Sequence, residues 1–203
     1  MPTRDPFRGF VAVPLPGDAA AALEAAARGF LGSAEAPGGD WRATPAPRIH
    51  LTLKFLGDTA AAAIPALGEA LREAARAAAG PVRATVGGWL LLPGPRDPRV
   101  LAAEVSDPTG TLPRMAAVVE GRAEALGFPR ESRRFLAHAT VARRRRGRGR
   151  GRGPGDGRGG RAVPPPASGR GPILLDRLVL MESVLGPEGP EYSVVLEEAL
   201  RGA

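Results

Sequence analysis

The stretch that decides the fold is residues 49–57, Ile-His-Leu-Thr-Leu-Lys-Phe-Leu-Gly, with its partial repeat at residues 135–141, Phe-Leu-Ala-His-Ala-Thr-Val. Each alternates in polarity and predicts a strand, because successive side chains of a strand point to opposite faces of its sheet. One face of the first strand is expected to be apolar, with Ile49, Leu51, Leu53 and Phe55. His50, Thr52 and Lys54 then share the other face. His138 and Thr140 take the corresponding places in the second strand, which makes an internal repeat.

The remaining pattern places strands and helices around this repeat. The predicted strands are residues 10–14, 48–56, 82–92, 100–105, 134–142, 173–182 and 192–197, and the predicted helices are 18–31 (capped by Asp18), 59–79 and 111–126. They form two similar halves, each with a helix beside antiparallel strands. We therefore predict an α+β, bilobal, pseudo-two-fold-symmetric fold, with two antiparallel sheets flanking a central cleft and helices outside.

Length and composition limit the class of protein. A chain of 203 residues can bury the core of one domain, so residues 1–203 are expected to form a single bilobal domain. No apolar run approaches the roughly 18 residues that cross a bilayer, and no secretory signal is evident at the start. The chain has no cysteine, which excludes disulfides and thiolate metal sites. We expect a cytoplasmic monomer without membrane contact.

The positive charge is concentrated in one segment. Residues 143–170 contain ten arginines and one aspartate, a charge of +9 that leaves about −2 for the rest of a chain whose net charge is +7. Residues 144–171 are also rich in glycine and proline, which predicts a disordered insertion. Its arginine-glycine alternation is typical of segments that contact RNA through charge and stacking. The alternative is an insertion without a role.

The two histidines of the chain, His50 and His138, are each followed two positions later by threonine. With eight threonines in 203 residues, chance gives this for both histidines roughly once in six hundred such chains. Histidine is available in either protonation state near neutrality, so a pair can divide acid and base work. A neutral imidazole can take a proton from water while a protonated one gives a proton to a leaving ribose oxygen. The threonine hydroxyls can donate hydrogen bonds to phosphate oxygens, and neither a metal nor a cofactor is required.

Two His-X-Thr-X strands 88 positions apart in a chain of this length resemble the two-histidine (2H) phosphoesterase superfamily. The closer resemblance is to its bacterial and archaeal RNA 2′,3′-cyclic phosphodiesterases, historically called 2′-5′ RNA ligases. Supporting segments are Arg-Gly-Phe-Val-Ala-Val at 8–13, Leu-Gly-Phe at 126–128, and the arginine that follows the second motif. Two departures are Gly9, where the family has a larger apolar residue, and Ala139, where it has leucine. The arginine-rich insertion is a third departure.

The resemblance implies a fold, an activity and roles for particular residues. Both motifs are expected in a central cleft that hydrolyses a 2′,3′-cyclic phosphate, on RNA or a nucleotide, to a 2′-phosphomonoester without a metal. His50 would be the proton donor to the leaving oxygen and His138 the proton acceptor that activates water. Thr52 and Thr140 are expected to bind the phosphate. Lys54 and Arg143 are further candidates for substrate binding. The alternative for Lys54 is a charge that is simply solvated, and the alternative for Arg143 is that it begins the arginine-rich loop.

Other functions stay open at this level. The same site can serve 2′-5′ RNA ligation or act on another small cyclic nucleotide. A different class of function is an RNA-binding module that works through the arginine-glycine segment and has vestigial histidines. Two intact His-X-Thr motifs argue against that second class.

Overall fold

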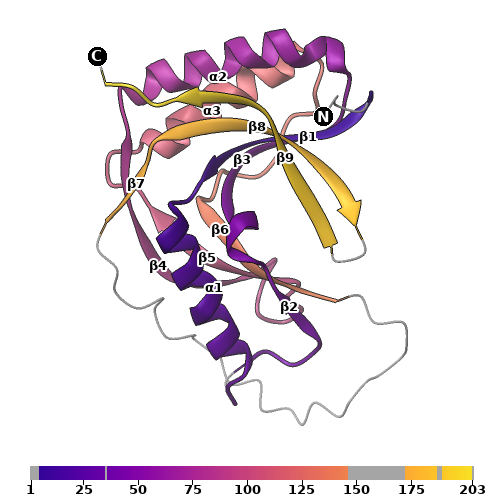
Figure 1. The fold of residues 1–203 in the computed structure, drawn as a ribbon, viewed down its shortest axis with the longest axis vertical. Helices are drawn as coiled ribbons and strands as arrows, with labels where there is room; N and C mark the ends of the chain where they lie inside the picture. Colours follow the sequence, from indigo (N-terminus) through magenta and orange to yellow (C-terminus); the bar gives the residue numbers. More distant parts are fainter. Residues whose placement is uncertain (1–4, 35, 146–171, 187–188, 203) are drawn as a thin grey trace.

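The computed structural model describes residues 5–34, 36–145, 172–186 and 189–202 (Figure 1). Its elements are β1 (Phe7–Pro14), α1 (Gly17–Leu31), β2 (Trp41–Ala43), η1 (Ala46–Arg48), β3 (His50–Thr59), η2 (Ala61–Ala63), α2 (Ile64–Ala78), β4 (Val82–Leu92), β5 (Val100–Ser106), α3 (Thr111–Ala125), β6 (His138–Arg144), β7 (Ile173–Leu175), β8 (Arg177–Gly186) and β9 (Gly189–Ala199). Most of the predicted insertion lies outside the described residues. Arg144 belongs to β6 and is 2.7 Å from Asp97, so the fold extends into the predicted segment.

The nine strands of the described residues form one curled antiparallel sheet. Its order is β7-β4-β5-β6-β3-β1-β8-β9, with β2 paired to β6. The predicted α+β, two-lobed antiparallel fold is confirmed. The two predicted sheets are the halves of this sheet, β7-β4-β5-β6 and β3-β1-β8-β9, and they join where Leu51 of β3 lies opposite Ala139 of β6.

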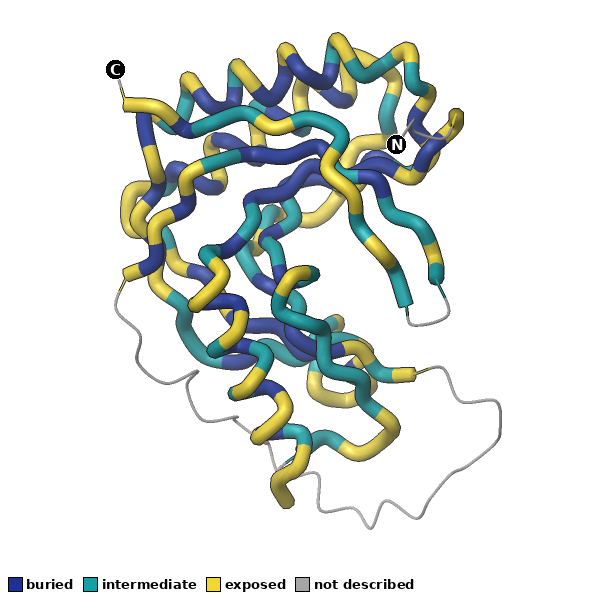
Figure 2. Tube along the Cα trace, viewed as in Figure 1, coloured by how far each residue is buried: buried dark blue, intermediate teal, exposed yellow. Residues whose placement is uncertain are grey.

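The helices lie on the periphery of the sheet. α2 and α3 pack together and against the half that contains β3, β8 and β9, while α1 packs on β2 and β6 (Figure 1). In Figure 2 the buried residues run along the central strands and the sheet-facing sides of the helices. Leu51, Leu67, Leu101, Met115 and Leu178 are almost fully buried in this core. No helix in the described part of the chain combines the length and apolar character needed to cross a membrane.

The start of α1 and the start of α2 differ from the predictions. α1 begins at Gly17 with Pro16 at the N-cap position, so the prediction that Asp18 caps it is wrong. Asp18 lies in the first turn, where a negative charge still interacts favourably with the helix dipole. The predicted helix 59–79 starts only at Ile64, because β3 continues to Thr59. Pro65 in the first turn fits this start, since proline lacks the amide hydrogen that a helix interior needs.

Some of the predicted strands differ from the strands of the structure. The predicted strand 173–182 is two strands, because the chain leaves β7 beside β4 and enters β8 beside β1 at Asp176. Asp176 and Arg177 are the one interruption of the apolar run at residues 173–181, and this charged pair does not by itself reveal the change of partner. β6 begins at His138 and not at residue 134, and the three-residue β2 has no counterpart among the predicted strands.

Packing explains why position 9 of β1 is a glycine. A Cβ added at this position would lie 2.7 Å from Thr59 Oγ1 and 3.0 Å from a ring carbon of Phe7. The position therefore has no room for the larger apolar residue unless Thr59 moves.

Candidate active site

The junction of the two half-sheets brings both His-X-Thr motifs together. Leu51 and Ala139, the middle residues of the motifs, lie opposite each other and are fully buried. Since side chains alternate along a strand, His50 and Thr52 on β3 and His138 and Thr140 on β6 all lie on the opposite face. We call these four side chains the tetrad. The antiparallel register at this pair places each histidine on the side of the threonine of the other motif.

A β-bulge follows each motif at the same distance from its histidine. On β3, Lys54 pairs with Val11 and Thr52 with Ala12, which leaves Leu53 as the extra residue. On β6, Ala142 pairs with Leu101 and Thr140 with Ala102, which leaves Val141 as the extra residue. A bulge sends two successive side chains to one face and reverses the alternation beyond it. The residues five positions after each histidine, Phe55 and Arg143, therefore join the tetrad face.

The prediction that Lys54 shares the face of His50 and Thr52 is wrong, and so is the prediction that Phe55 shares the apolar face of Leu51 and Leu53. Lys54 is 4% exposed, and its Nζ donates to Glu120 Oε1 at 2.9 Å and to the Pro129 carbonyl at 2.6 Å. Phe55 is 65% exposed, and its ring centroid lies 6.1 Å from that of Phe10. The bulge at Leu53, which polarity alternation does not reveal, causes both differences.

Both imidazoles are oriented in the same way. His50 Nδ1 lies 2.9 Å from the Arg48 carbonyl, and His138 Nδ1 lies 2.8 Å from the Leu136 carbonyl. A carbonyl only accepts hydrogen bonds, so each Nδ1 carries a hydrogen and donates it. Nε2 of each ring is then the atom left for proton transfer. The two halves repeat this orientation, with the accepting carbonyl two residues before each histidine.

Aromatic rings and positive charges surround His50. Its ring centroid is 4.9 Å from that of Phe10 and 5.1 Å from that of Tyr192, which meets it edge-on. Burial, followed by the charges of Arg143 and His138, lowers the pKa of His50 to about 4, although the hydrogen bond to Arg48 acts in the opposite direction. In the protein alone His50 is thus neutral at pH 7. Burial also raises the pKa of Tyr192, which remains a hydroxyl donor at that pH.

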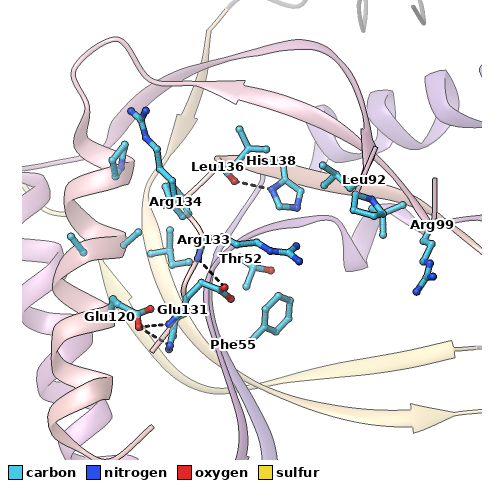
Figure 3. A pocket seen from close by; sticks show the side chains of 18 residues that line it. Thr52, Phe55, Leu92, Arg99, Glu120, Glu131, Arg133, Arg134, Leu136 and His138 are labelled. Carbon is cyan, nitrogen blue, oxygen red and sulfur yellow. Dashed lines mark hydrogen bonds and ion pairs between the residues drawn. The ribbon is translucent and has the colours of Figure 1, made fainter. Parts of the chain in front are cut away.

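The tetrad lies between two cavities of very different size. The smaller, about 60 Å³, is lined by His50, Thr140, Arg143 and Tyr192, among others. The larger, about 1050 Å³, is lined by Thr52, Phe55, Arg133 and His138, with residues of α3 and of the segment before β6 (Figure 3). A water molecule occupies about 30 Å³ in the liquid, so the smaller cavity has room for only a small group, about the volume of two water molecules. The larger has the size of pockets that take whole small-molecule ligands.

Arg143 lies at the edge of the smaller cavity. Its exposed side chain points to the tetrad face because of the bulge at Val141, and its charge acts on both His50 and Tyr192. The candidate site thus combines two imidazoles with free Nε2 atoms, two hydroxyl groups and a guanidinium group. Such a set can bind a phosphate anion and transfer protons on both sides of it.

This fold and site define a phosphoesterase of the two-histidine class, and comparisons with known proteins agree. The model of the LigT-like phosphoesterase family matches residues 13–102. The structure of TT0787 from Thermus thermophilus is 30% identical, covers 96% of this chain and 98% of its own, and has a TM-score of 0.70. The chain belongs to the LigT-like phosphoesterases, within the 2H phosphoesterase superfamily.

Other solved structures share the fold. Escherichia coli LigT without ligand is 20% identical, with 98% of this chain and 99% of LigT covered and a TM-score of 0.70. LigT in complex with 3′-AMP is 21% identical, with coverage of 97% and 99% and a TM-score of 0.69. A comparison with curated protein sequences gives no match.

Three residues of the site do not follow from the sequence pattern. Tyr192 comes from β9, more than 50 positions after His138, and its one signal is that the chain has a single tyrosine. Phe10 lies in the strand predicted at residues 10–14, where nothing in the pattern indicates its ring contact with His50. Arg133 lies in the segment before β6 and has no distinguishing feature among 27 arginines.

Proposed function

We propose that this protein hydrolyses a 2′,3′-cyclic phosphate, at the end of an RNA or on a nucleotide, to a 2′-phosphomonoester. The observation that carries the proposal is the tetrad, in which two imidazoles with free Nε2 atoms alternate with two hydroxyl groups on paired strands. Hydrolysis of a cyclic phosphodiester needs a base on the side of the attacking water and an acid on the side of the leaving oxygen. Two histidines at opposite corners of the tetrad meet that need.

In this proposal the phosphate lies at the junction of the two cavities. Thr52 and Thr140 donate hydrogen bonds to its non-bridging oxygens, and Arg143 adds charge from the smaller cavity. The ribose and base extend into the larger cavity, where the exposed ring of Phe55 offers a stacking surface. Nucleotide ligands are also found in related structures, since E. coli LigT has been crystallised with 3′-AMP, ATP and NADP⁺.

The chemical step involves one water molecule and two protons. Water attacks phosphorus and its proton passes to the neutral imidazole of His138, while the bond from phosphorus to the 3′ oxygen breaks. His50 as imidazolium gives a proton to that oxygen. The products are a 3′-hydroxyl and a 2′-phosphomonoester, and the exchange of one proton through solvent restores the enzyme.

The low pKa of His50 in the protein alone bears on this order of roles. A neutral His50 at pH 7 is ready to accept a proton, which favours the reverse assignment. A bound cyclic phosphate carries a negative charge that offsets the charge of Arg143 and favours the His50 imidazolium. His50 is therefore the proton donor in this proposal, and a substrate with a sulfur leaving group distinguishes the two orders.

A panel of substrates tests the proposed function. Purified protein should convert a 2′,3′-cyclic nucleotide to the 2′-phosphomonoester, identified by phosphorus NMR, and should leave a 3′,5′-cyclic nucleotide intact. An arm that supplies an RNA with a free 5′-hydroxyl reports ligation, and an arm with an ADP-ribose cyclic phosphate reports another cyclic substrate. Turnover in one of these arms with none on 2′,3′-cyclic nucleotides would contradict the proposal.

A further inference from the structure

Three arginines line the larger cavity, Arg99, Arg133 and Arg134, and the proposed chemistry uses none of them. Arg133 lines this cavity together with Thr52, Phe55 and His138, and in Figure 3 its side chain extends between the labelled His138 and Phe55. Within the described residues its side chain forms no ion pair. Arg99 on the far side of the cavity is 3.2 Å from Asp97, so its charge is already engaged.

The segment that carries Arg133 is anchored. Glu120 of α3 binds Lys54 and also accepts a hydrogen bond from the Glu131 backbone at 2.9 Å. The carboxylate of Glu131 in turn accepts from the Arg133 backbone N–H at 3.3 Å. The base of the Arg133 side chain is thus held by backbone contacts, and its end is left free toward the cavity. The anchored backbone thus keeps the exposed Arg133 side chain beside the cavity.

The size of the larger cavity indicates which anion Arg133 binds. In the proposed function the cyclic phosphate lies between the tetrad and Arg143, on the side of the smaller cavity, and its nucleoside takes part of the larger one. At about 1050 Å³ the larger cavity lies at the upper end of the range for whole small-molecule ligands, so it has room for more than one nucleoside. Phe55 of β3 and Leu136 of the segment before β6 also line this cavity, and both are exposed apolar side chains.

We infer that Arg133 binds the phosphate on the 5′ oxygen of the terminal ribose, as the phosphodiester that joins the last two nucleotides of an RNA. This inference rests on the proposed function and adds that the substrate is an oligonucleotide. A free nucleotide with a 5′-phosphate presents the same group at the same place. The difference between these two sources is that an RNA has a further nucleoside, which the remaining volume accommodates.

The test compares kcat/KM for three adenosine substrates that share a 2′,3′-cyclic phosphate. One has a 5′-hydroxyl, one has a 5′-phosphate, and one is the dinucleotide. Arg133→Ala should lower kcat/KM for the dinucleotide about tenfold to a hundredfold and leave the 5′-hydroxyl substrate within about twofold, as expected for loss of a charged hydrogen bond. Arg133→Lys should retain part of the preference. Arg130→Ala is the matched control, since Arg130 is exposed on the same segment and faces Glu124.

Three other outcomes overturn the inference. An equal loss on all three substrates would place Arg133 at the cyclic phosphate, and an unchanged set of values would give it no role. A loss confined to the 5′-phosphate substrate would identify a free nucleotide as the ligand. If wild-type protein turns over none of the three, the proposed function fails. The inference is then tested by binding of the 2′-phosphate mononucleotide and dinucleotide, whose affinity ratio should still fall in Arg133→Ala.

Discussion

At the scale of single residues, the carbonyl two positions before each histidine decides what that histidine can do. Arg48 and Leu136 hold Nδ1 as a hydrogen donor, which leaves Nε2 free in both rings. Their surroundings differ, because His50 is enclosed by Phe10 and Tyr192 and close to Arg143. The two imidazoles are thus oriented in the same way but lie in different electrostatic surroundings. A division of acid and base roles requires such a difference.

A sulfur leaving group identifies the acid. In a 2′,3′-cyclic substrate with sulfur in place of the bridging 3′ oxygen, the departing thiolate needs no proton. His50→Ala should lose about a hundredfold to ten-thousandfold of kcat on the oxygen substrate and recover most of it on the sulfur substrate. His138→Ala should stay impaired on both. Recovery in His138→Ala instead of His50→Ala would exchange the two roles.

The depressed pKa of His50 predicts a pH dependence of stability. The folded protein holds His50 neutral down to about pH 4, whereas the unfolded chain protonates it below its ordinary value of 6.5. The unfolded state therefore binds more protons in this window, and the free energy of unfolding should fall as pH falls from 6.5 to 4. Urea unfolding at pH 7 and pH 4.5 should show a larger loss for wild type than for His50→Gln. Equal losses would show that His50 titrates normally in the folded protein.

At the scale of elements, the two bulges give the cleft its asymmetry. They lie at equivalent positions of β3 and β6, and each sends the residue five after the histidine into the cleft. One half contributes the aromatic ring of Phe55 and the other the guanidinium of Arg143. The repeat thus supplies the same backbone twice and places two different side chains, an aromatic ring and a guanidinium group, on the tetrad face.

The ion pair between β3 and α3 stabilises the wall of the cleft. Lys54 is nearly buried against Glu120 and the Pro129 carbonyl, so Lys54→Met leaves a partly buried carboxylate without its partner. Breaking a buried pair costs roughly 3–5 kcal/mol, and we expect the lower end because Glu120 keeps some exposure. Chemical unfolding should show this loss, and the double variant Lys54→Met with Glu120→Gln should recover part of it. Wild-type stability in Lys54→Met would contradict this role.

How far the sequence predicts these elements depends on the physical signal. The repeat of His50-Leu51-Thr52 and His138-Ala139-Thr140 is sufficient to predict two inner strands, the antiparallel class and the four tetrad residues as candidates. Bulges have no signature in polarity alternation, so the alternation assigns Lys54 and Phe55 to the wrong faces. Contacts between distant segments, such as Tyr192 with His50, are set by packing that a local pattern does not contain.

At the scale of the whole molecule, the site lies where two half-sheets meet. The order β6-β3 at the centre of the sheet joins the half with α1 to the half with α2 and α3. Each half supplies one histidine and one threonine, so neither half contains a complete acid and base pair. Activity should therefore depend on the integrity of the whole fold.

The arginine-rich segment, proposed from sequence as an RNA contact, is tested by its removal. Deleting residues 147–171 takes away six arginines and one aspartate and lowers the net charge from +7 to +2. Hydrolysis of a cyclic mononucleotide should stay nearly unchanged, while affinity for longer RNA should fall. The log-log dependence of RNA affinity on salt should flatten by about 0.7 per lost phosphate contact. The same affinity and salt dependence in both proteins would show that the segment does not contact RNA.

The most direct test of the central claim is turnover of a 2′,3′-cyclic nucleotide by wild type, His50→Ala and His138→Ala with excess chelator present. Two-histidine catalysis predicts full wild-type turnover under these conditions and a loss of about a hundredfold or more in each variant, with circular dichroism showing an intact fold. Loss of wild-type activity on chelation that a divalent metal restores, or near-wild-type turnover in either variant, would contradict it.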